Sequence, residues 1–438
     1  MHAVAHVQIP TTDSSHAAAA VVSALRAAGH SAFWVGGCVR DLLLGVPPKD
    51  YDVATSATPK HVNALFPQVV QVGVAFGVVR VQQGLADGRT VEVEVATFRK
   101  DGVYRDGRRP DTVQFTDARE DVLRRDFTIN GLLLDPLAGD SHGQVVDWVG
   151  GLADLQARQL RAIGEPAQRF GEDALRLLRA PRFAARFGLT VEPLTAAAIR
   201  ALAATLDRVS VERIHMELMH MLGTPTAPAA LRLLVELGLA AALWPQLIAA
   251  DPGLARTIAR VERLGAVAAA VAPGALPGCA AADAVLAVAA LALPDRDWPD
   301  TAEFRQSTLF SRHDGLALRQ MLELARTNPL PPQPGPPPWP IPWAHWLRAP
   351  LADHALVLQT AAGPHDWHAW RQARANWPLD QAFPALGFDG RDLLQWGYAA
   401  GPAFKQALVA AENVRLLGGD VAAARAAARA VLDTTSTR

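Results

Sequence analysis

Hydrophobic positions change their spacing near residue 150 of the chain. Upstream of this point, apolar residues form short alternating or continuous runs with Gly-rich turns between them, at 69–72, 78–82, 91–95 and 129–134. Such runs predict strands, and together they indicate an α/β unit. Downstream, Leu and Ala recur at helical spacing, as at Leu231, Leu234 and Val235, and we expect no strand there. The predicted fold class is α+β, with an N-terminal α/β unit followed by an all-α remainder.

The length and composition of the chain narrow its class. At 438 residues it exceeds one ordinary core, and half of its residues are hydrophobic, so we expect several domains. The longest apolar run, residues 284–293, is too short to span a bilayer, and the N-terminus lacks a signal-peptide pattern. Only two cysteines occur, Cys38 and Cys279, which argues against a disulfide framework and a Cys-based metal site. A cytoplasmic protein without a membrane partner is therefore expected.

Charge along the chain is balanced, with a formal net charge of −1. Bulk positive charge therefore cannot hold a nucleic acid, and any RNA site must be a local patch. Three arginines near the C-terminus, Arg415, Arg425 and Arg429, are candidates for such a patch. They would face either an RNA backbone or solvent.

Two short stretches carry the chemistry of the N-terminal unit. Gly36 and Gly37 follow a short apolar run that predicts a strand, and glycine lets the backbone approach a phosphate where a Cβ would collide. Asp50 and Asp52 are two residues apart, so a strand over 51–54 would project both carboxylates from one face. Such a pair suits two Mg²⁺ ions, which would activate an attacking hydroxyl and neutralise a leaving pyrophosphate. The pattern indicates a nucleotide-polymerising site.

The sequence around these residues, GGCVRDLLLGVPPKDYDVATSATP, resembles the signature of the tRNA nucleotidyltransferase and bacterial poly(A) polymerase family, called class II. Three further stretches are similar to motifs of that family and follow in the family's order: TVEVEVATFR at 90–99, RRDFTING at 124–131 and EDALRLLR at 172–179. Two positions depart from the family pattern, since the family usually has Ala at Gly131 and an aliphatic residue at Pro181. Pro181 removes a backbone donor, so we expect a kink or break at 177–180.

The resemblance implies catalytic and nucleotide-binding roles. Asp50 and Asp52 would be the catalytic metal ligands, and Glu94, at the family's acidic strand position, would assist them. The residues expected to bind the nucleotide are Gly36, Gly37 and Arg40 for the triphosphate, Arg125, Asp126 and Asn130 for ribose and phosphates, and Asp173, Arg176 and Arg179 for the base. On one helix, Asp173 and Arg176 would lie at i and i+3 and point at one ligand.

The resemblance also implies a domain order and partners. The expected parts are a catalytic head at 1–157, a neck with the base-selecting helix at 158–224, a helical body at 225–327, a Pro-rich linker at 328–344 and a helical tRNA-binding tail at 345–438. The expected activity is template-independent addition of CMP and AMP to the 3′ end of tRNA, with Mg²⁺ as cofactor. The expected partners are tRNA, ATP and CTP, and no obligatory protein partner is evident.

Three alternatives remain open. The first two are an enzyme that adds only the last A and a poly(A) polymerase. The Gly-rich and charged stretch 98–115 predicts a loop that accompanies addition of the terminal A in the family, and this chain retains it. The third is an inactive RNA-binding or scaffold protein on the same fold, against which the intact Asp50 and Asp52 argue.

Overall fold

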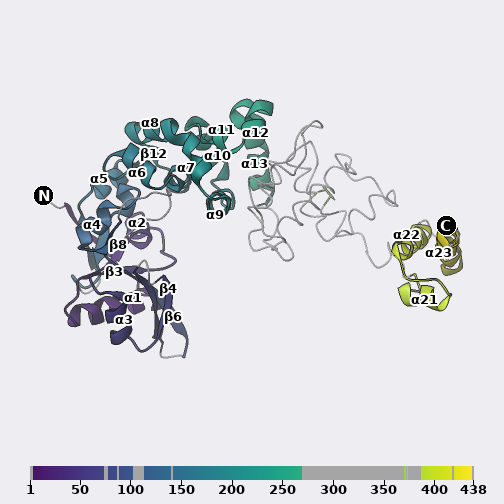
Figure 1. Cartoon of the computed structure of the whole chain (residues 1–438), viewed down its shortest axis with the longest axis horizontal. Coiled ribbons are helices and arrows are strands. Elements are labelled where there is room, and N and C mark those ends of the chain that lie inside the picture. The colour runs from purple at the N-terminus through teal and green to yellow at the C-terminus, as the bar shows by residue number, and fades with distance from the viewer. Residues whose placement is uncertain are drawn as a thin grey trace. The chain divides into compact units, whose positions relative to one another are not determined.

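The computed structural model describes residues 3–73, 77–85, 88–101, 113–139, 142–268, 369–370, 372, 386–416 and 419–436. Two compact units divide the chain near Ala255, and each is described by itself (Figure 1). The predicted linker at 328–344, the apolar run at 284–293, Cys279 and most of the predicted loop at 98–115 lie outside the described residues. No helix in the described ranges is both long and apolar enough to cross a membrane.

An eight-stranded mixed sheet forms the first half of the N-terminal unit. In spatial order its strands are β1 (Ala3–Gln8), β10 (His142–Asp147), β9 (Leu133–Asp135), β2 (Ala32–Val35), β3 (Asp52–Thr55), β6 (Thr90–Thr97), β5 (Val78–Gly84) and β4 (Val69–Gly73). All neighbours pair antiparallel except β3 and β6, which run parallel. This arrangement brings β2, β3 and β6 side by side at the centre of the sheet.

The apolar runs of the N-terminal half correspond to these strands. The runs at 69–72, 78–82 and 91–95 lie in β4, β5 and β6, so those predictions are confirmed. The run at 129–134 divides into a 3₁₀ turn, η2 (Thr128–Asn130), followed by β9. Strand β1 has no counterpart in the prediction, and it forms the edge of the sheet by pairing with β10.

Helices cover the sheet and connect its strands (Figure 1). They are α1 (Asp13–Ala27), α2 (Gly37–Leu43), α3 (Pro59–Leu65) and α4 (Ala118–Leu123), with a separate two-stranded ribbon of β7 (Arg99–Asp101) and β8 (Val113–Phe115). Helix α1 packs on β2, β3 and β6 through buried Ala18, Val21, Val22 and Leu25. Its N-cap Thr12 accepts a hydrogen bond from the Ser15 N–H, which satisfies one free donor of the first turn.

Where the structure describes the chain after residue 150, it is mainly helical, as predicted. Its elements in the first unit are α5 (Gly151–Gln156), β11 (Gln159–Leu160), α6 (Pro166–Glu172), α7 (Leu175–Phe187), β12 (Thr190–Val191), α8 (Pro193–Leu202), η3 (Ala203–Arg208), α9 (Val211–Leu222), α10 (Ala227–Glu236), α11 (Leu239–Leu243), α12 (Pro245–Ala250) and η4 (Pro252–Leu254). The expectation of no strand was wrong in one detail, because β11 and β12 form a two-residue parallel ladder. The α+β class itself is confirmed.

The expected base-selecting helix is divided at Asp173. Its backbone, with φ −146° and ψ 104°, is extended, so α6 ends before it and α7 begins after it. The Asp173 side chain accepts a hydrogen bond from the Leu175 N–H at 3.1 Å, which favours a turn over a continuing helix. The prediction that Asp173 and Arg176 share one helix is therefore wrong.

A break at 177–180, one of the two outcomes expected from Pro181, is wrong, since α7 continues through these residues, and a kink there stays a prediction. Pro181 leaves only the Leu177 carbonyl without its usual intrahelical donor. The buried face of α7, which includes Leu177, Leu178 and Phe183, packs against α9 and α10 and offsets this loss.

The described part of the second unit consists of α13 (Ala255–Ala268) and three C-terminal helices, α21 (Gly390–Gln395), α22 (Pro402–Leu416) and α23 (Val421–Ser436). Alanines pack α22 closely against α23, and the small core they share contains Leu393, Ala407, Ala411, Ala424, Ala428 and Leu432. Of the tail arginines, Arg415 donates to the Gly419 carbonyl at 2.7 Å, which lies between the end of α22 and the start of α23. Arg425 and Arg429 stack over Phe388 and Trp396.

Candidate active site

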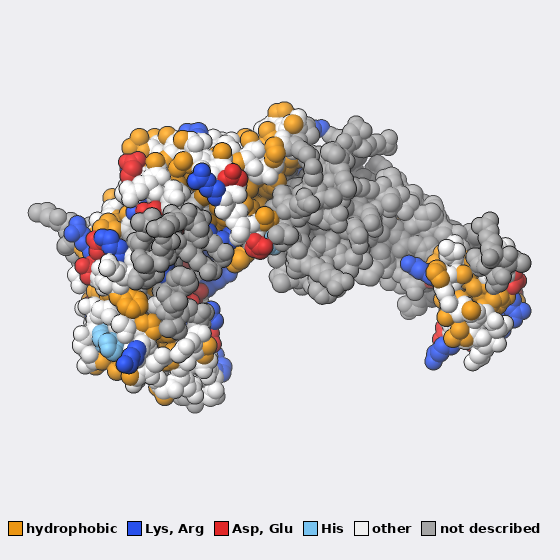
Figure 2. Space-filling model, viewed as in Figure 1, with side chains coloured by type: hydrophobic (Ala, Val, Ile, Leu, Met, Phe, Trp, Pro, Cys, Tyr) orange, Lys and Arg blue, Asp and Glu red, His pale blue; other side chains and the backbone are white. Residues whose placement is uncertain are grey.

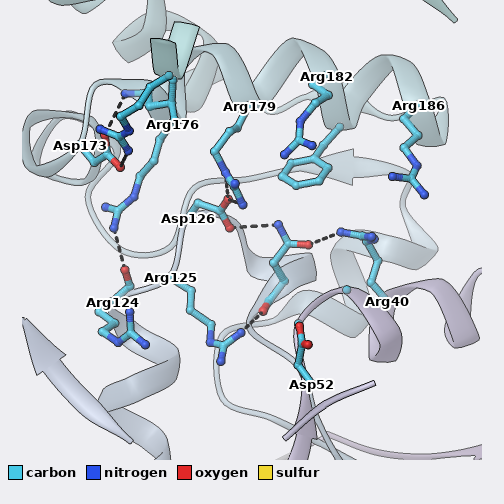
Figure 3. A pocket seen from close by; sticks show the side chains of 16 residues that line it. Arg40, Asp52, Arg124, Arg125, Asp126, Asp173, Arg176, Arg179, Arg182 and Arg186 are labelled. Carbon is cyan, nitrogen blue, oxygen red and sulfur yellow. Dashed lines mark hydrogen bonds and ion pairs between the residues drawn. The ribbon is translucent and has the colours of Figure 1, made fainter. Parts of the chain in front are cut away.

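A pocket of about 470 Å³ lies between the central strands and α7 (Figure 3). Eight arginines and three aspartates line it, together with Gly36, Gly37, Asn130, Leu175 and Phe183. The arginines are Arg40, Arg124, Arg125, Arg176, Arg179, Arg182, Arg186 and Arg213, and the aspartates are Asp52, Asp126 and Asp173. This excess of positive charge suits a polyanionic ligand such as a nucleoside triphosphate.

Positive charge is concentrated in this pocket. On the face shown in Figure 2, acidic and basic side chains are interspersed over the described residues. The near-neutral net charge therefore conceals a local cationic site. Most of the sequence-predicted site residues line it, and only Asp50 and Glu94 do not.

The turn after β2 brings the backbone to the floor of the pocket. Because β2 pairs antiparallel with β3, Val35 lies opposite Asp52, and Gly36 leaves the sheet beside that carboxylate. Gly36 has φ 71° and ψ −121°, a conformation that only glycine adopts without strain. A Cβ at this position would lie 3.1 Å from Nη1 of Arg125.

The Gly36→Ala variant is expected to lose at least about tenfold in kcat/KM for nucleotide while remaining folded. Backbone strain of order 1–3 kcal/mol and displacement of Arg125 both act at the pocket. Steady-state kinetics together with thermal unfolding check this result. Gly45→Ala is the matched control, because Gly45 also has positive φ but a Cβ there meets nothing within 4 Å. Equal loss of activity in both variants would contradict a role specific to Gly36.

Acidic residues surround the start of β3. Asp52 is the first residue of that strand, whereas the exposed Asp50 precedes it, so the expected strand over 51–54 begins one residue later. Glu94 lies beside Asp52 on β6, because the parallel register pairs Val53 with Val95. Burial, together with the charges of Glu94 and Asp50, raises the pKa of Asp52 to about 6, and the charge of Arg125 acts in the opposite direction. A carboxylate in this position favours a nearby cation.

The donor set fits magnesium with two protein ligands. The described residues contain no group of three or more His, Cys, Asp or Glu side chains gathered to hold a metal ion. Mg²⁺ commonly takes one or two carboxylates and completes its octahedron with waters and substrate phosphates. Asp50 and Asp52 can supply such a pair. Glu94 is half-exposed and lies 3.9 Å from Nε of Arg80, and its charge raises the pKa of Asp52.

A buried network joins α7 to the turn after α4. Asp126 accepts from Arg179 at 2.7 Å and from the Asn130 amide at 3.0 Å, and Asn130 in turn accepts from Arg40 at 2.6 Å. Burial alone would raise the pKa of Asp126, but Arg179, Asn130 and the Phe127 N–H hold it at about 2. The structure therefore brings together four of the predicted residues, Arg40, Asp126, Asn130 and Arg179. They form hydrogen bonds with one another and also line the pocket.

The expected base-selecting residues face the pocket from separate positions (Figure 3). Asp173 forms an ion pair with Arg213 of α9 at 2.8 Å instead of pairing with Arg176. Arg176 donates to Glu172 at 2.8 Å and to the Arg124 carbonyl at 2.9 Å. The described residues provide no hydrogen-bond acceptor for its Nε. Each side chain is thus fixed by the protein and retains hydrogen-bonding capacity for a ligand.

Sequence reasoning missed several pocket residues, including Arg182, Arg186 and Arg213. Arg182 and Arg186 follow Arg179 at i+3 and i+7 on α7, and Figure 3 shows all three projecting from one side of that helix. This spacing was a signal that could have found them. Nothing in the sequence connects Arg213 to Asp173, which is 40 residues away.

Packing explains why Gly131 stands where the family usually has Ala. A Cβ on Gly131 would lie 2.9 Å from Val149 and 3.1 Å from Ile163, so its neighbours occupy the space of a methyl group. Glycine here keeps the turn after Asn130 in place.

Family comparisons match two parts of the chain. Residues 32–161 match the Poly A polymerase head domain, and residues 188–251 match a family described as a probable RNA and SrmB-binding site of polymerase A. The fold and the pocket define a nucleotidyltransferase with a poly(A) polymerase head, which confirms the class inferred from sequence.

Two relatives and one solved structure show which nucleotidyltransferases the chain is similar to. The CCA-adding enzyme of Geobacillus stearothermophilus is 37% identical over 400 residues, which are 89% of each chain. That of Geobacillus thermodenitrificans is 44% identical over 237 residues, 54% of each chain. The crystal structure of the Bacillus stearothermophilus CCA-adding enzyme in complex with CTP has a TM-score of 0.70 at 30% identity, over 93% of this chain and 94% of that one. The chain belongs to the family of CCA-adding enzymes, which generally use a divalent metal.

Proposed function

We propose that this protein builds or repairs the CCA end of tRNA by adding CMP and AMP from CTP and ATP. Membership of the CCA-adding family supports the proposal, and a relative at 30% identity was solved with CTP. The observation that carries it is the pocket in which the Gly36 turn and Asp52 face a row of arginines on α7. We also propose Mg²⁺ as the metal and the cytoplasm as the location.

The residues divide the chemistry between the two ends of the nucleotide. Gly36, Gly37 and Arg40 cradle the triphosphate, since backbone N–H groups and a guanidinium are good phosphate donors. Arg125, Asp126 and Asn130 contact ribose and phosphates. Asp173, Arg176 and Arg179 face the base, and we add Arg182 as a further contact from the same helix.

The reaction is an in-line displacement at the α-phosphorus. The tRNA 3′-hydroxyl oxygen forms the new bond, and the bond to pyrophosphate breaks. Asp50 and Asp52 would hold the Mg²⁺, which would supply positive charge to activate the hydroxyl and neutralise the leaving group. Arg125, whose charge acts on Asp52, holds the phosphates close to these carboxylates, and Glu94 assists by adding negative charge beside them.

For the domains, we propose a head at 1–157, a neck at 158–224 and a helical body from 225. The sheet of the first unit ends with β10 at Asp147, which supports the first boundary. The tail at 345–438 would hold tRNA, and its last three helices have their own core.

Extension of defined tRNAs tests the proposed function. Purified protein would receive tRNAs ending before CCA, after C and after CC, with CTP, ATP or both. Addition to all three supports the proposal. Activity only on the CC-ending tRNA would identify an enzyme that adds only A, and long A tracts would identify a poly(A) polymerase. No extension of any tRNA would favour an inactive RNA-binding protein.

Removing residues 386–438 is expected to weaken tRNA binding at least about tenfold and to leave CTP binding unchanged. The deleted helices α21, α22 and α23 form a separate small core, so their loss should spare the pocket. Titration of full-length and truncated protein with each ligand measures the two affinities. Equal losses for both ligands, or no loss for tRNA, would contradict a tRNA-holding tail.

A further inference from the structure

Asp121 on α4 is a buried carboxylate directly behind the pocket. It is 1% exposed and is not among the residues that line the pocket. Its Oδ1 accepts hydrogen bonds from the Arg99 N–H at 3.2 Å and from Nη2 of Arg124 at 2.6 Å. Its Oδ2 accepts from Nη2 of Arg125 at 3.0 Å. One side chain therefore holds groups from three different positions of the chain.

The contact with Arg125 reaches the phosphate end of the site. Nη1 of Arg125 lies close to Gly36, and the charge of Arg125 lowers the pKa of Asp52. Among the described residues, its other hydrogen bond is a long one, 3.5 Å to the Asn130 carbonyl. Within the described part of the chain, Asp121 thus supplies the one short hydrogen bond that fixes the direction of this guanidinium.

The contact with Arg124 reaches the base end. The Asp121 carboxylate fixes the Arg124 side chain through both Nε and Nη2. The Arg124 carbonyl accepts from Nη2 of Arg176, which faces the base in the proposed function. The third contact, with the Arg99 N–H, ties the same carboxylate to the first residue of β7.

We propose that Asp121 is a positioning residue that sets the phosphate-binding and base-reading arginines in one geometry, and this inference rests on the proposed function. It acts through Arg125 at one end and through Arg124 and Arg176 at the other. Loss of its charge would loosen both ends together, because a neutral side chain cannot hold two guanidinium groups as firmly.

Asp121→Asn, which keeps the size of the side chain, tests this role. We expect the KM for CTP to rise and kcat/KM to fall roughly 10- to 100-fold, the range for loss of charge-assisted hydrogen bonds. Discrimination against UTP should fall with it. Asp121→Glu, which restores the charge, should recover part of both, and it also serves if the Asn variant fails to fold. Glu120→Gln is the matched control, because Glu120 lies on the same helix and pairs with Lys100 of β7 at the exposed surface.

A double-mutant cycle separates positioning from general destabilisation. If Asp121 acts through Arg125, combining Asp121→Asn with Arg125→Lys should cost little beyond the worse single variant. The inference would be overturned if the losses of kcat/KM in the two single variants were fully additive. It would also be overturned if Asp121→Asn lowered the thermal stability but left the KM and the CTP-to-UTP ratio unchanged. Wild-type protein that fails to extend tRNA would count against the proposed function instead. The affinities of the wild type and of Asp121→Asn for CTP, measured by titration with Ca²⁺ in place of Mg²⁺, would then decide the inference. Equal affinities would overturn it.

Discussion

Asp52→Asn protein is expected to incorporate almost no nucleotide while folding at least as stably as the wild type. Loss of a metal-binding carboxylate should raise the barrier by about 4 kcal/mol or more, roughly a thousandfold in rate. Steady-state incorporation of CMP into tRNA lacking CCA measures this loss. Asp50→Asn should behave similarly, whereas Asp135→Asn, which removes a carboxylate paired with Arg26 outside the pocket, should retain activity.

Thermal unfolding gives a second test of Asp52→Asn, because the variant is expected to gain stability while it loses activity. The folded-state pKa of Asp52, about 6, lies above the ordinary aspartate value of 3.8, so ionised Asp52 costs stability. The cost grows as pH rises from about 4 to 6 and is complete above pH 6. In metal-free buffer at pH 7.5, Asp52→Asn should therefore unfold at an equal or higher temperature, with a gain of up to about 3 kcal/mol. An active variant, or an inactive one that is strongly destabilised, would contradict this assignment.

Asp173→Ala and Arg176→Ala are expected to slow use of CTP and ATP and to weaken discrimination against UTP and GTP. Cytosine and adenine each present an exocyclic amine beside an unprotonated ring nitrogen. A carboxylate accepts from the amine, and a guanidinium donates to the ring nitrogen. Uracil and guanine present a carbonyl oxygen and a protonated nitrogen instead, so both contacts would be mismatched.

Each good base contact contributes about 1–3 kcal/mol of discrimination, or roughly ten- to a hundredfold. Measurement of kcat/KM for all four nucleotides in both variants gives this ratio directly. Arg200→Ala is the control, because Arg200 pairs with the exposed Glu236 outside the pocket. If the CTP-to-UTP ratio stays at its wild-type value in both pocket variants, these residues do not read the base.

Local patterns were enough to predict much of the head and of its site. Apolar runs predicted β4, β5 and β6, and β5 and β6 bury alternate side chains as the pattern requires. The Gly36 turn and Asp52 come from strands that follow one another in sequence and pair in the sheet, so their proximity was predictable. The neighbouring Glu94 comes from a strand beside them.

Long-range contacts decided what the sequence could not. The turn at Asp173 is held by the hydrogen bond that its carboxylate accepts from the Leu175 N–H and by its ion pair with Arg213, and the distant partner Arg213 could not be read from the sequence. At Pro181 the local rule predicted a break, but tertiary packing of the buried face of α7 outweighs one lost hydrogen bond. Of the hydrogen bonds to Asp121, those from Arg124 and Arg125 are local i,i+3 and i,i+4 contacts, whereas the one from the Arg99 N–H depends on how α4 meets β7.

The sequence of the product made in one reaction tests the central claim most directly. Wild-type protein, tRNA lacking its CCA end, Mg²⁺ and all four nucleoside triphosphates would be combined, and the new 3′ ends would be sequenced. We expect nearly all extended molecules to end in CCA, with no further addition. Tracts of A, ends that include U or G, or no extension at all would contradict it.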